Sequence, residues 1–81
     1  MDDGPVRSLR AFRLARPFSI RELAAAADVS PMTVQRIERG LPARPATMRA
    51  LAAALGVRPA QISEFRPLLG IEDDTTQETP R

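Results

Sequence analysis

The spacing of apolar residues between positions 20 and 39 constrains the fold of this chain more than any other feature. The segment reads IRELAAAADVSPMTVQRIER. Its apolar side chains fall on one stripe of a first helix and one stripe of a second, namely Leu23, Ala24 and Ala27, then Val34 and Ile37. Ala24 is small enough to let a neighbouring backbone come close, and Val29 is placed to fill the corner. The pattern therefore predicts two short helices that cross at a tight turn.

Basic and acidic residues are unevenly distributed along the 81 residues. Residues 4–66 contain eleven arginines and four acidic residues, a formal charge of +7, whereas residues 67–81 carry −3 and residues 1–3 carry −2. A positively charged body between acidic ends suits a polyanionic partner. A surface of solvated arginines with no partner explains the same charge equally well, so charge alone leaves the choice open.

The chain contains no cysteine and no histidine. Without cysteine there are no disulfides or thiolate metal sites, and without histidine the commonest general base is missing. We therefore expect no enzymatic activity, no metal ion and no cofactor. No apolar run approaches the roughly 20 residues of a membrane span, and the first residues, MDDGPVRS, lack the apolar core of a signal peptide. We expect a cytoplasmic protein that makes no contact with a membrane.

Proline and a capping motif place the first two helices. Pro5 suits a first helical position, so a helix can begin there and end before Pro17. Ser19 and Glu22 have the spacing of a capping box, which predicts that a second helix begins at this point and runs to Ala27.

Four residues predict where the turn lies and where the third helix begins and ends. Asp28 lies in the turn, where the backbone often needs a positive φ that aspartate tolerates better than most residues. Ser30 and Pro31 restart the helix. The third helix then carries residues 32–39 and stops at Gly40, a residue suited to left-handed backbone.

The remaining chain predicts two more helices and a tail. A fourth helix begins at Pro45 and ends at Gly56, and its apolar stripe consists of Met48, Leu51, Ala52 and Leu55. Pro59 opens a short fifth helix that brings Ile62 and Phe65 inward. The predicted fold class is thus all-α, a compact five-helix bundle.

The bundle is expected to form one domain over residues 1–66. Residues 67–81 are expected to form an acidic, disordered tail, because the last part is polar and poor in apolar side chains.

Three blocks of sequence together carry a family resemblance. They are LRAFRLAR with FS behind it, ELAAAADVSPMTVQRIERG, and TMRALAAALGV. In this order and spacing they resemble the phage-repressor and Cro type of helix-turn-helix domain, often called the XRE family, over residues 9–65. The resemblance implies five helices, with the second and third forming the unit that reads DNA. The chain departs from the family pattern at Pro17 and Asp28, where glycine is common, and at Ile20, where a phosphate-contacting glutamine is usual.

The resemblance implies that the third helix lies in the major groove of DNA. The side chains expected to meet base edges are Pro31, Met32, Thr33, Gln35 and Arg36. Arg36 is the strongest candidate, because a guanidinium can pair with both acceptors of guanine, while Gln35 can read adenine or reach a phosphate. Pro31 and Met32 can offer an apolar contact to a thymine methyl group. A solvated helix face without a ligand remains the alternative.

Phosphate contacts are expected from five residues around this helix, Arg10, Ser19, Ser30, Arg39 and Arg44. Helix capping is the alternative role of the two serines, and a loop arginine without a target is the alternative for Arg44. The resemblance also places Arg13 and Glu38 within reach of an ion pair that ties the first helix to the third. Such a pair is structural rather than DNA-binding.

The resemblance further implies a homodimer whose contacts come from residues 58–65, with Arg58, Gln61, Ile62 and Phe65 at the interface. The leading hypothesis is a sequence-specific transcriptional regulator that binds double-stranded DNA, a repressor on a palindromic operator. One alternative is an antitoxin-like or partner-binding module whose C-terminal tail captures another protein. A second alternative is an architectural or recombination accessory factor that bends DNA.

Overall fold

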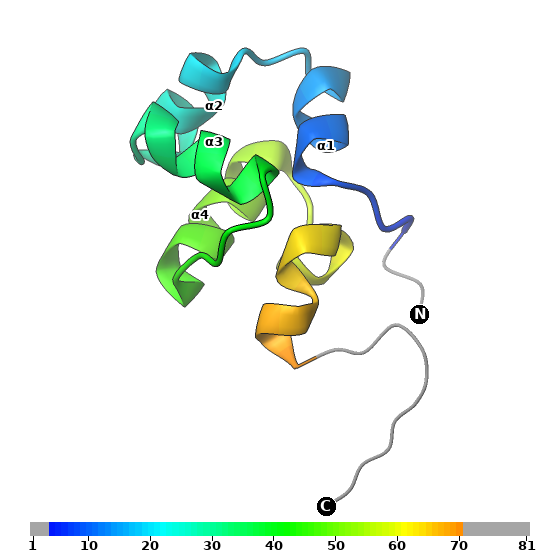
Figure 1. Ribbon diagram of the computed structural model, residues 1–81. Coiled ribbons are helices and arrows are strands. Elements are labelled where there is room, and N and C mark those ends of the chain that lie inside the picture. Colours follow the sequence, from blue (N-terminus) through cyan, green and yellow to red (C-terminus); the bar gives the residue numbers. More distant parts are fainter. Residues whose placement is uncertain (1–3, 71–81) are drawn as a thin grey trace, which may run out of the picture.

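The computed structural model describes residues 4–70, which form four α-helices followed by three 3-10 turns (Figure 1). The elements are α1 (Leu9–Ala15), α2 (Ile20–Ala27), α3 (Pro31–Glu38), α4 (Pro45–Leu55), η1 (Pro59–Gln61), η2 (Ser63–Phe65) and η3 (Pro67–Leu69). The predicted all-α fold is confirmed. Three successive 3-10 turns stand in the place of the fifth helix. No helix among residues 4–70 is long and apolar enough to cross a membrane.

One core lies between the helices and the last turns. Helices α2 and α3 pack against each other, and α4 packs across α2 (Figure 1). The buried hydrophobic side chains are Leu9, Leu23, Ala24, Ala27, Val34, Ile37, Met48, Leu51, Ala52, Leu55, Ile62 and Phe65. Every apolar stripe predicted for the second, third and fourth helices is included. Burial of these stripes provides the main driving force for a domain of this size.

The turn between α2 and α3 has the left-handed backbone predicted for it. Asp28 adopts φ 58° and ψ 45°, and its N–H donates to the carbonyl oxygens of Ala24 and Ala25. Val29 N–H also donates to the Ala24 carbonyl at 2.9 Å. Ala24 is only 1% exposed, as expected for a small residue where two helices meet closely.

Helix α1 begins later than predicted. It starts at Leu9 rather than Pro5, because the Ser8 hydroxyl accepts a hydrogen bond from Ala11 N–H and caps the helix at that point. The φ fixed by a proline ring also suits extended backbone, so Pro5 does not by itself begin a helix. The third helix likewise ends at Glu38, with Arg39 as its C-cap, one residue earlier than predicted.

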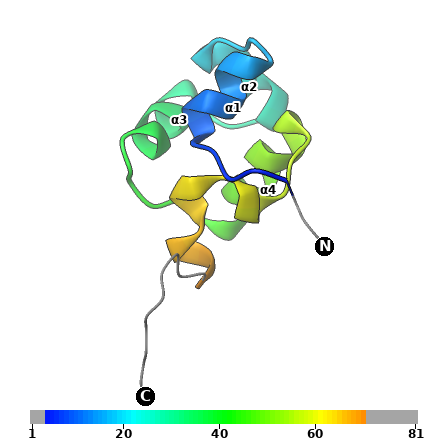
Figure 2. The ribbon, with the colours of Figure 1, turned by 90° about the vertical axis from the view of Figure 1, so that its right-hand side faces the viewer.

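The segment before α1 pairs with the last turns of the chain. Arg7 N–H donates to the Gln61 carbonyl at 2.9 Å, and Ser63 N–H donates to the Arg7 carbonyl at 2.8 Å. Leu9 N–H donates to Glu64 Oε1 at 2.8 Å. Figure 2 shows this N-terminal segment crossing the turns at residues 59–65. The two ends of the domain are therefore joined directly by hydrogen bonds.

The left-handed conformation of Asp28 can be tested by substitution. We expect Asp28→Val to lower the free energy of unfolding by about 1–2 kcal/mol, because a β-branched side chain clashes in left-handed backbone. Asp28→Gly should raise it by about 0.5 kcal/mol, since glycine adopts this conformation without a Cβ clash but gains entropy when unfolded. Urea denaturation followed by circular dichroism measures both changes. A valine variant as stable as the native protein would contradict the turn geometry.

Candidate nucleic-acid interface

Helix α3 is held by its cap and by two buried side chains. The Ser30 hydroxyl accepts a hydrogen bond from Thr33 N–H at 3.1 Å, and Pro31 occupies the first turn. Val34 and Ile37 are 0% and 1% exposed and face the core. Because an α-helix repeats every 3.6 residues, burying these two positions turns the opposite side of α3 to solvent.

The solvent side of α3 carries what we call the outward stripe, which consists of Met32, Gln35, Arg36 and Arg39. All four side chains are exposed, and they follow the i, i+3, i+4, i+7 spacing of one helix face. Pro31 is exposed beside them at the start of the helix. The structure thus brings four of the five predicted base-reading residues to one exposed surface.

Thr33 differs from the other predicted base-reading residues. Its side chain is only partly exposed, and its hydroxyl lies 2.9 Å from the Ser30 hydroxyl, within hydrogen-bond distance. The hydroxyl therefore supports the start of α3, and the side chain lies at the edge of the outward stripe.

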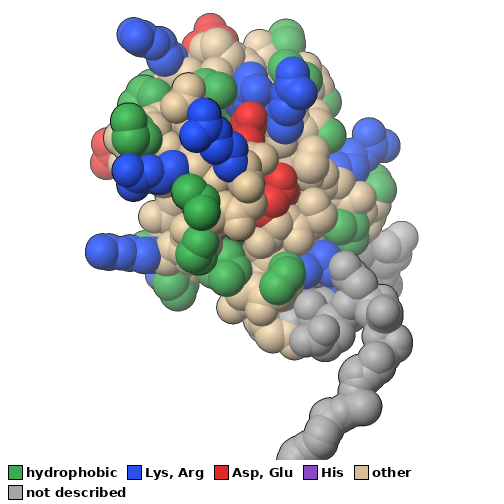
Figure 3. Space-filling model, viewed as in Figure 1, with side chains coloured by type: hydrophobic (Ala, Val, Ile, Leu, Met, Phe, Trp, Pro, Cys, Tyr) green, Lys and Arg blue, Asp and Glu red, His purple; other side chains and the backbone are tan. Residues whose placement is uncertain are grey.

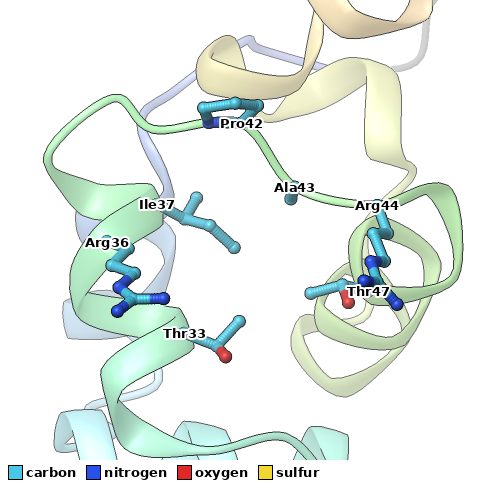
Figure 4. A pocket seen from close by; sticks show the side chains of 7 residues that line it. All are labelled: Thr33, Arg36, Ile37, Pro42, Ala43, Arg44 and Thr47. Atoms are coloured by element: carbon cyan, nitrogen blue, oxygen red, sulfur yellow. The ribbon is translucent and has the colours of Figure 1, made fainter.

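A cleft separates α3 from the start of α4. We call it the α3–α4 cleft, and it has a volume of about 380 Å³. Figure 4 shows its lining residues, which are Thr33, Arg36, Ile37, Pro42, Ala43, Arg44 and Thr47. Thr33 of α3 and Thr47 of α4 face each other across the cleft, with Arg36 on the α3 side and Arg44 on the α4 side (Figure 4). Sequence reasoning missed Thr47, because only the apolar stripe of α4 was considered there.

A second cleft lies on the other side of α3. This α1–α3 cleft has a volume of about 390 Å³ and is lined by Arg10, Arg13, Ile20, Gln35, Glu38 and Arg39. Ile20 is half-buried and packs against the core, so it contributes an apolar contact where the family usually has glutamine. Arg10 and Arg39 are exposed. Two predicted phosphate-binding arginines therefore line the same cleft.

A buried ion pair lies at the base of the α1–α3 cleft. Arg13 Nε donates to Glu38 Oε2 at 2.6 Å and Arg13 Nη2 donates to Glu38 Oε1 at 3.2 Å, so the pair is bidentate. The two side chains are 8% and 11% exposed. Arg13 Nη1 also donates to the Phe18 carbonyl at 2.9 Å. Each of the three guanidinium nitrogens donates a hydrogen bond inside the protein, so the ion pair that the resemblance implied supports the fold.

The two serines act as helix caps. The Ser19 hydroxyl accepts from Glu22 N–H at 3.0 Å, and Glu22 Oε1 accepts from Ser19 N–H at 2.7 Å, which completes the predicted capping box. Both serine side chains are exposed as well. Capping is thus their role in the fold, and phosphate contact remains a prediction.

The body of the domain is positively charged. Arginine side chains are spread over the visible face of the molecule, including the part that carries α1, α2 and α3, with acidic side chains among them (Figure 3). Three of the four acidic residues between positions 4 and 66 accept hydrogen bonds inside the fold, Glu22 from Ser19, Glu38 from Arg13 and Glu64 from Leu9. Of these, Glu38 is paired with Arg13. With eleven arginines against four acidic residues between positions 4 and 66, the body of the domain carries a net positive charge, which attracts anions.

The predicted dimer contact must be corrected at two positions. Ile62 and Phe65 are both 0% exposed, because their side chains fill the core beneath the last turns. They are unavailable to a second subunit. Arg58 is exposed and Gln61 is half-buried, and the Gln61 side chain accepts a hydrogen bond from Arg58 N–H at 2.9 Å.

Two short helices crossing at a left-handed turn, with the second presenting an exposed polar stripe, define a helix-turn-helix protein. A family model described as helix-turn-helix (HTH_3) matches residues 9–62, most of the chain. The chain belongs to this XRE-type family of DNA-binding transcriptional regulators. No curated protein and no solved structure matches it significantly.

The buried ion pair gives a test of how α3 is held. We expect Glu38→Ala to lower the free energy of unfolding by about 3 kcal/mol, because Arg13 would remain buried without its partner. DNA binding should weaken in parallel as α3 loses its orientation. Thermal denaturation and a binding titration measure the two effects. Arg39→Ala, which removes an exposed neighbour, is the matched control for stability. Unchanged thermal stability of Glu38→Ala would refute the structural role of the pair.

Proposed function

We propose that the protein is a sequence-specific repressor that binds a palindromic operator as a homodimer. The observation that carries this proposal is the arrangement of α3, whose outward stripe stands between two clefts lined by arginines. The major groove of B-DNA is about 12 Å wide and admits one α-helix, with a phosphate backbone on each side. A helix flanked by two basic clefts matches that pattern.

The side chains of this surface divide into two groups. Arg36 and Gln35 contact base edges, with Met32 and Pro31 beside them, because these residues are exposed near the start of α3. The backbone contacts come from the clefts. Arg10 and Arg39 meet one strand at the α1–α3 cleft, and Arg44 and Thr47 meet the other strand at the α3–α4 cleft. Thr33 contributes at the edge of that second cleft, and the amide ends of α2 and α3 at Ser19 and Ser30 add anion contacts.

The family resemblance and the exposed surface of the last turns both support the proposed homodimer. Because Ile62 and Phe65 are buried, the proposed contact consists of Arg58, Gln61 and two leucines a few residues further along the chain. Leu68 and Leu69 in η3 are 43% and 42% exposed. Apolar side chains of this size on adjacent positions suit a self-complementary contact about a two-fold axis.

Selection of bound duplexes from a random pool tests the proposal. The expected result is one enriched near-palindrome, with half-sites about one helical turn, or 34 Å, apart. Sedimentation of the complex should show two chains on each site. A single chain bound to a site without two-fold symmetry would contradict the homodimer. A complete lack of enrichment would contradict sequence-specific binding itself.

Two arginine substitutions separate base reading from backbone contact. Arg36→Ala should relax preference at one base position, with a loss of about 1–3 kcal/mol for the preferred base. Arg44→Ala should weaken binding to all sequences alike and reduce the slope of log affinity against log salt by about one unit. Titrations of operator variants across a salt series measure both. Arg49, an exposed arginine of α4 that lines neither cleft, provides the matched control. If Arg36→Ala and Arg44→Ala changed binding in the same way, the distinction between a base-reading and a backbone-binding arginine would be refuted.

The partner-binding alternative depends on the C-terminal tail. Residues 71–81 lie outside the described residues, and Pro67–Leu69, the start of the predicted tail, form the turn η3. Capture of another protein by the tail therefore stays a prediction. The DNA-bending alternative likewise has no described contact that favours it over the repressor.

A further inference from the structure

The α3–α4 cleft has basic side chains in its lining and no acidic one among the described residues. Arg36 and Arg44 line it from opposite sides, and Thr47 adds a hydroxyl group (Figure 4). The α1–α3 cleft differs, because the carboxylate of Glu38 is part of its lining. Two guanidinium groups with no carboxylate between them favour an anionic ligand.

Both arginines of the α3–α4 cleft are available to such a ligand. Arg36 and Arg44 are exposed, and neither forms an ion pair with any of residues 4–70. A guanidinium is always charged, and its fork of N–H groups matches a carboxylate as well as a phosphate. The cleft can therefore bind carboxylates with the same two side chains that the proposed function assigns to DNA.

The chain carries a run of carboxylates shortly after the last described residue. Glu72, Asp73 and Asp74 are consecutive, and residues 71–81 contain four acidic residues and one arginine, a formal charge of −3. Successive residues of an extended chain are about 3.3 Å apart. One strand of DNA carries a phosphate charge about every 3.4 Å along the helix axis. The acidic run can therefore repeat its charge at nearly the spacing of a DNA strand.

The position of Gly70 keeps this acidic run near the cleft. Turn η1 packs against α4, and η3 ends at Gly70, the last described residue. Figures 1 and 2 show η3 at the same end of the molecule as the start of α4, where Arg44 and Thr47 lie. A chain extends by at most about 3.5 Å per residue, so Asp74 stays within about 14 Å of Gly70. The run is thus tethered at the end of the domain where α4 lines the cleft.

We propose that residues 72–74 occupy the α3–α4 cleft of their own chain when DNA is absent, with carboxylates on Arg36 and Arg44. A ligand on a short flexible tether has an effective concentration on the order of millimolar, so weak ion pairs are enough to hold it. The consequence rests on the proposed function, in which a phosphate backbone enters the same cleft. DNA must then displace the acidic run, and the run lowers the affinity for every duplex.

A spin label on the tail tests where the acidic run lies. The chain has no cysteine, so Thr76→Cys in the full chain provides one attachment site for a nitroxide. At low salt we expect the label to broaden the NMR signals of the Arg36, Arg44 and Thr47 amides, while the Arg21 amide in α2 stays sharp. The broadening should disappear at about 1 M salt, where the Debye length is about 3 Å. Addition of a DNA duplex should abolish it as well.

A neutral tail provides the matched control. Glu72→Gln, Asp73→Asn and Asp74→Asn, made together, keep the side-chain shapes and remove the three charges. The spin-labelled chain with these replacements should leave the cleft amides sharp at every salt concentration. It should melt like the native protein, because the replaced residues follow the last turn of the domain.

The same neutral tail should strengthen DNA binding. At low salt we expect it to bind a duplex about fivefold more tightly than the native chain, the factor for two exposed ion pairs of ordinary strength. In an Arg44→Ala background the tail replacement should have only about a twofold effect, since one of the two pairs is then missing. In an Arg49→Ala background, which alters neither cleft, the fivefold effect should remain. Fluorescence anisotropy titrations measure these affinities.

Several results would overturn the inference. Cleft amides that stay sharp beside the labelled native tail would exclude docking. Full broadening in a mixture of spin-labelled and isotope-enriched chains would assign the contact to another copy. An equal effect of the neutral tail with and without Arg44 would show that the tail repels DNA at long range and does not occupy the cleft. The spin-label measurement without DNA is independent of operator recognition, so a random pool that yields no enriched duplex would refute the proposed function alone.

Discussion

The buried guanidinium of Arg13 holds three parts of the chain in one arrangement. It belongs to α1, it makes a bidentate pair with Glu38 at the end of α3, and it donates to the Phe18 carbonyl ahead of α2. A buried charge is costly unless its hydrogen bonds are satisfied, so each partner must stay in place. The direction of α3 relative to the body follows from this constraint. The exposed face of α3 is therefore presented as part of a rigid body and not as a loosely attached helix.

The acidic residues of the domain also have structural roles. The carboxylates of Glu22, Glu38 and Glu64 serve the fold by accepting hydrogen bonds from a cap, from an arginine and from the first amide of α1. Arg10 and Arg39 share their cleft with Glu38, whose carboxylate is paired with Arg13. The whole chain has a formal charge of +2, but residues 4–66, which include α3, carry eleven arginines against four acidic residues and are therefore positively charged.

Local signals in the sequence predicted the parts of the fold that depend on local physics. The capping box of Ser19 and Glu22, the left-handed turn at Asp28 and the stop at Gly56 each depend on residues a few positions apart. The start of α1 was misplaced because Pro5 was taken as the first helical residue, whereas Ser8 caps the helix and the segment before it is extended and pairs with the residues around Ile62. Family knowledge supplied the partner of Arg13, which spacing alone does not reveal.

The candidate site likewise contains some residues that local sequence could place and others that only the tertiary fold brings together. Exposure of Met32, Gln35 and Arg36 follows from helix periodicity, so sequence reasoning could place them on one face. Thr47 enters the α3–α4 cleft only because the loop between the helices brings α4 alongside α3. The prediction that Ile62 and Phe65 point inward is confirmed by their complete burial, whereas the dimer contact that the resemblance assigned to the same two residues is excluded by it.

The hydrogen bond from Leu9 N–H to Glu64 has a consequence for how the protein is made. Its two partners are 55 positions apart, and the neighbouring bonds of Arg7 span a similar distance. On a ribosome, these hydrogen bonds between the two ends of the domain therefore form only after Glu64 has emerged. Native folding is postponed to the last stage of translation, and an interrupted nascent chain lacks the element that closes its core.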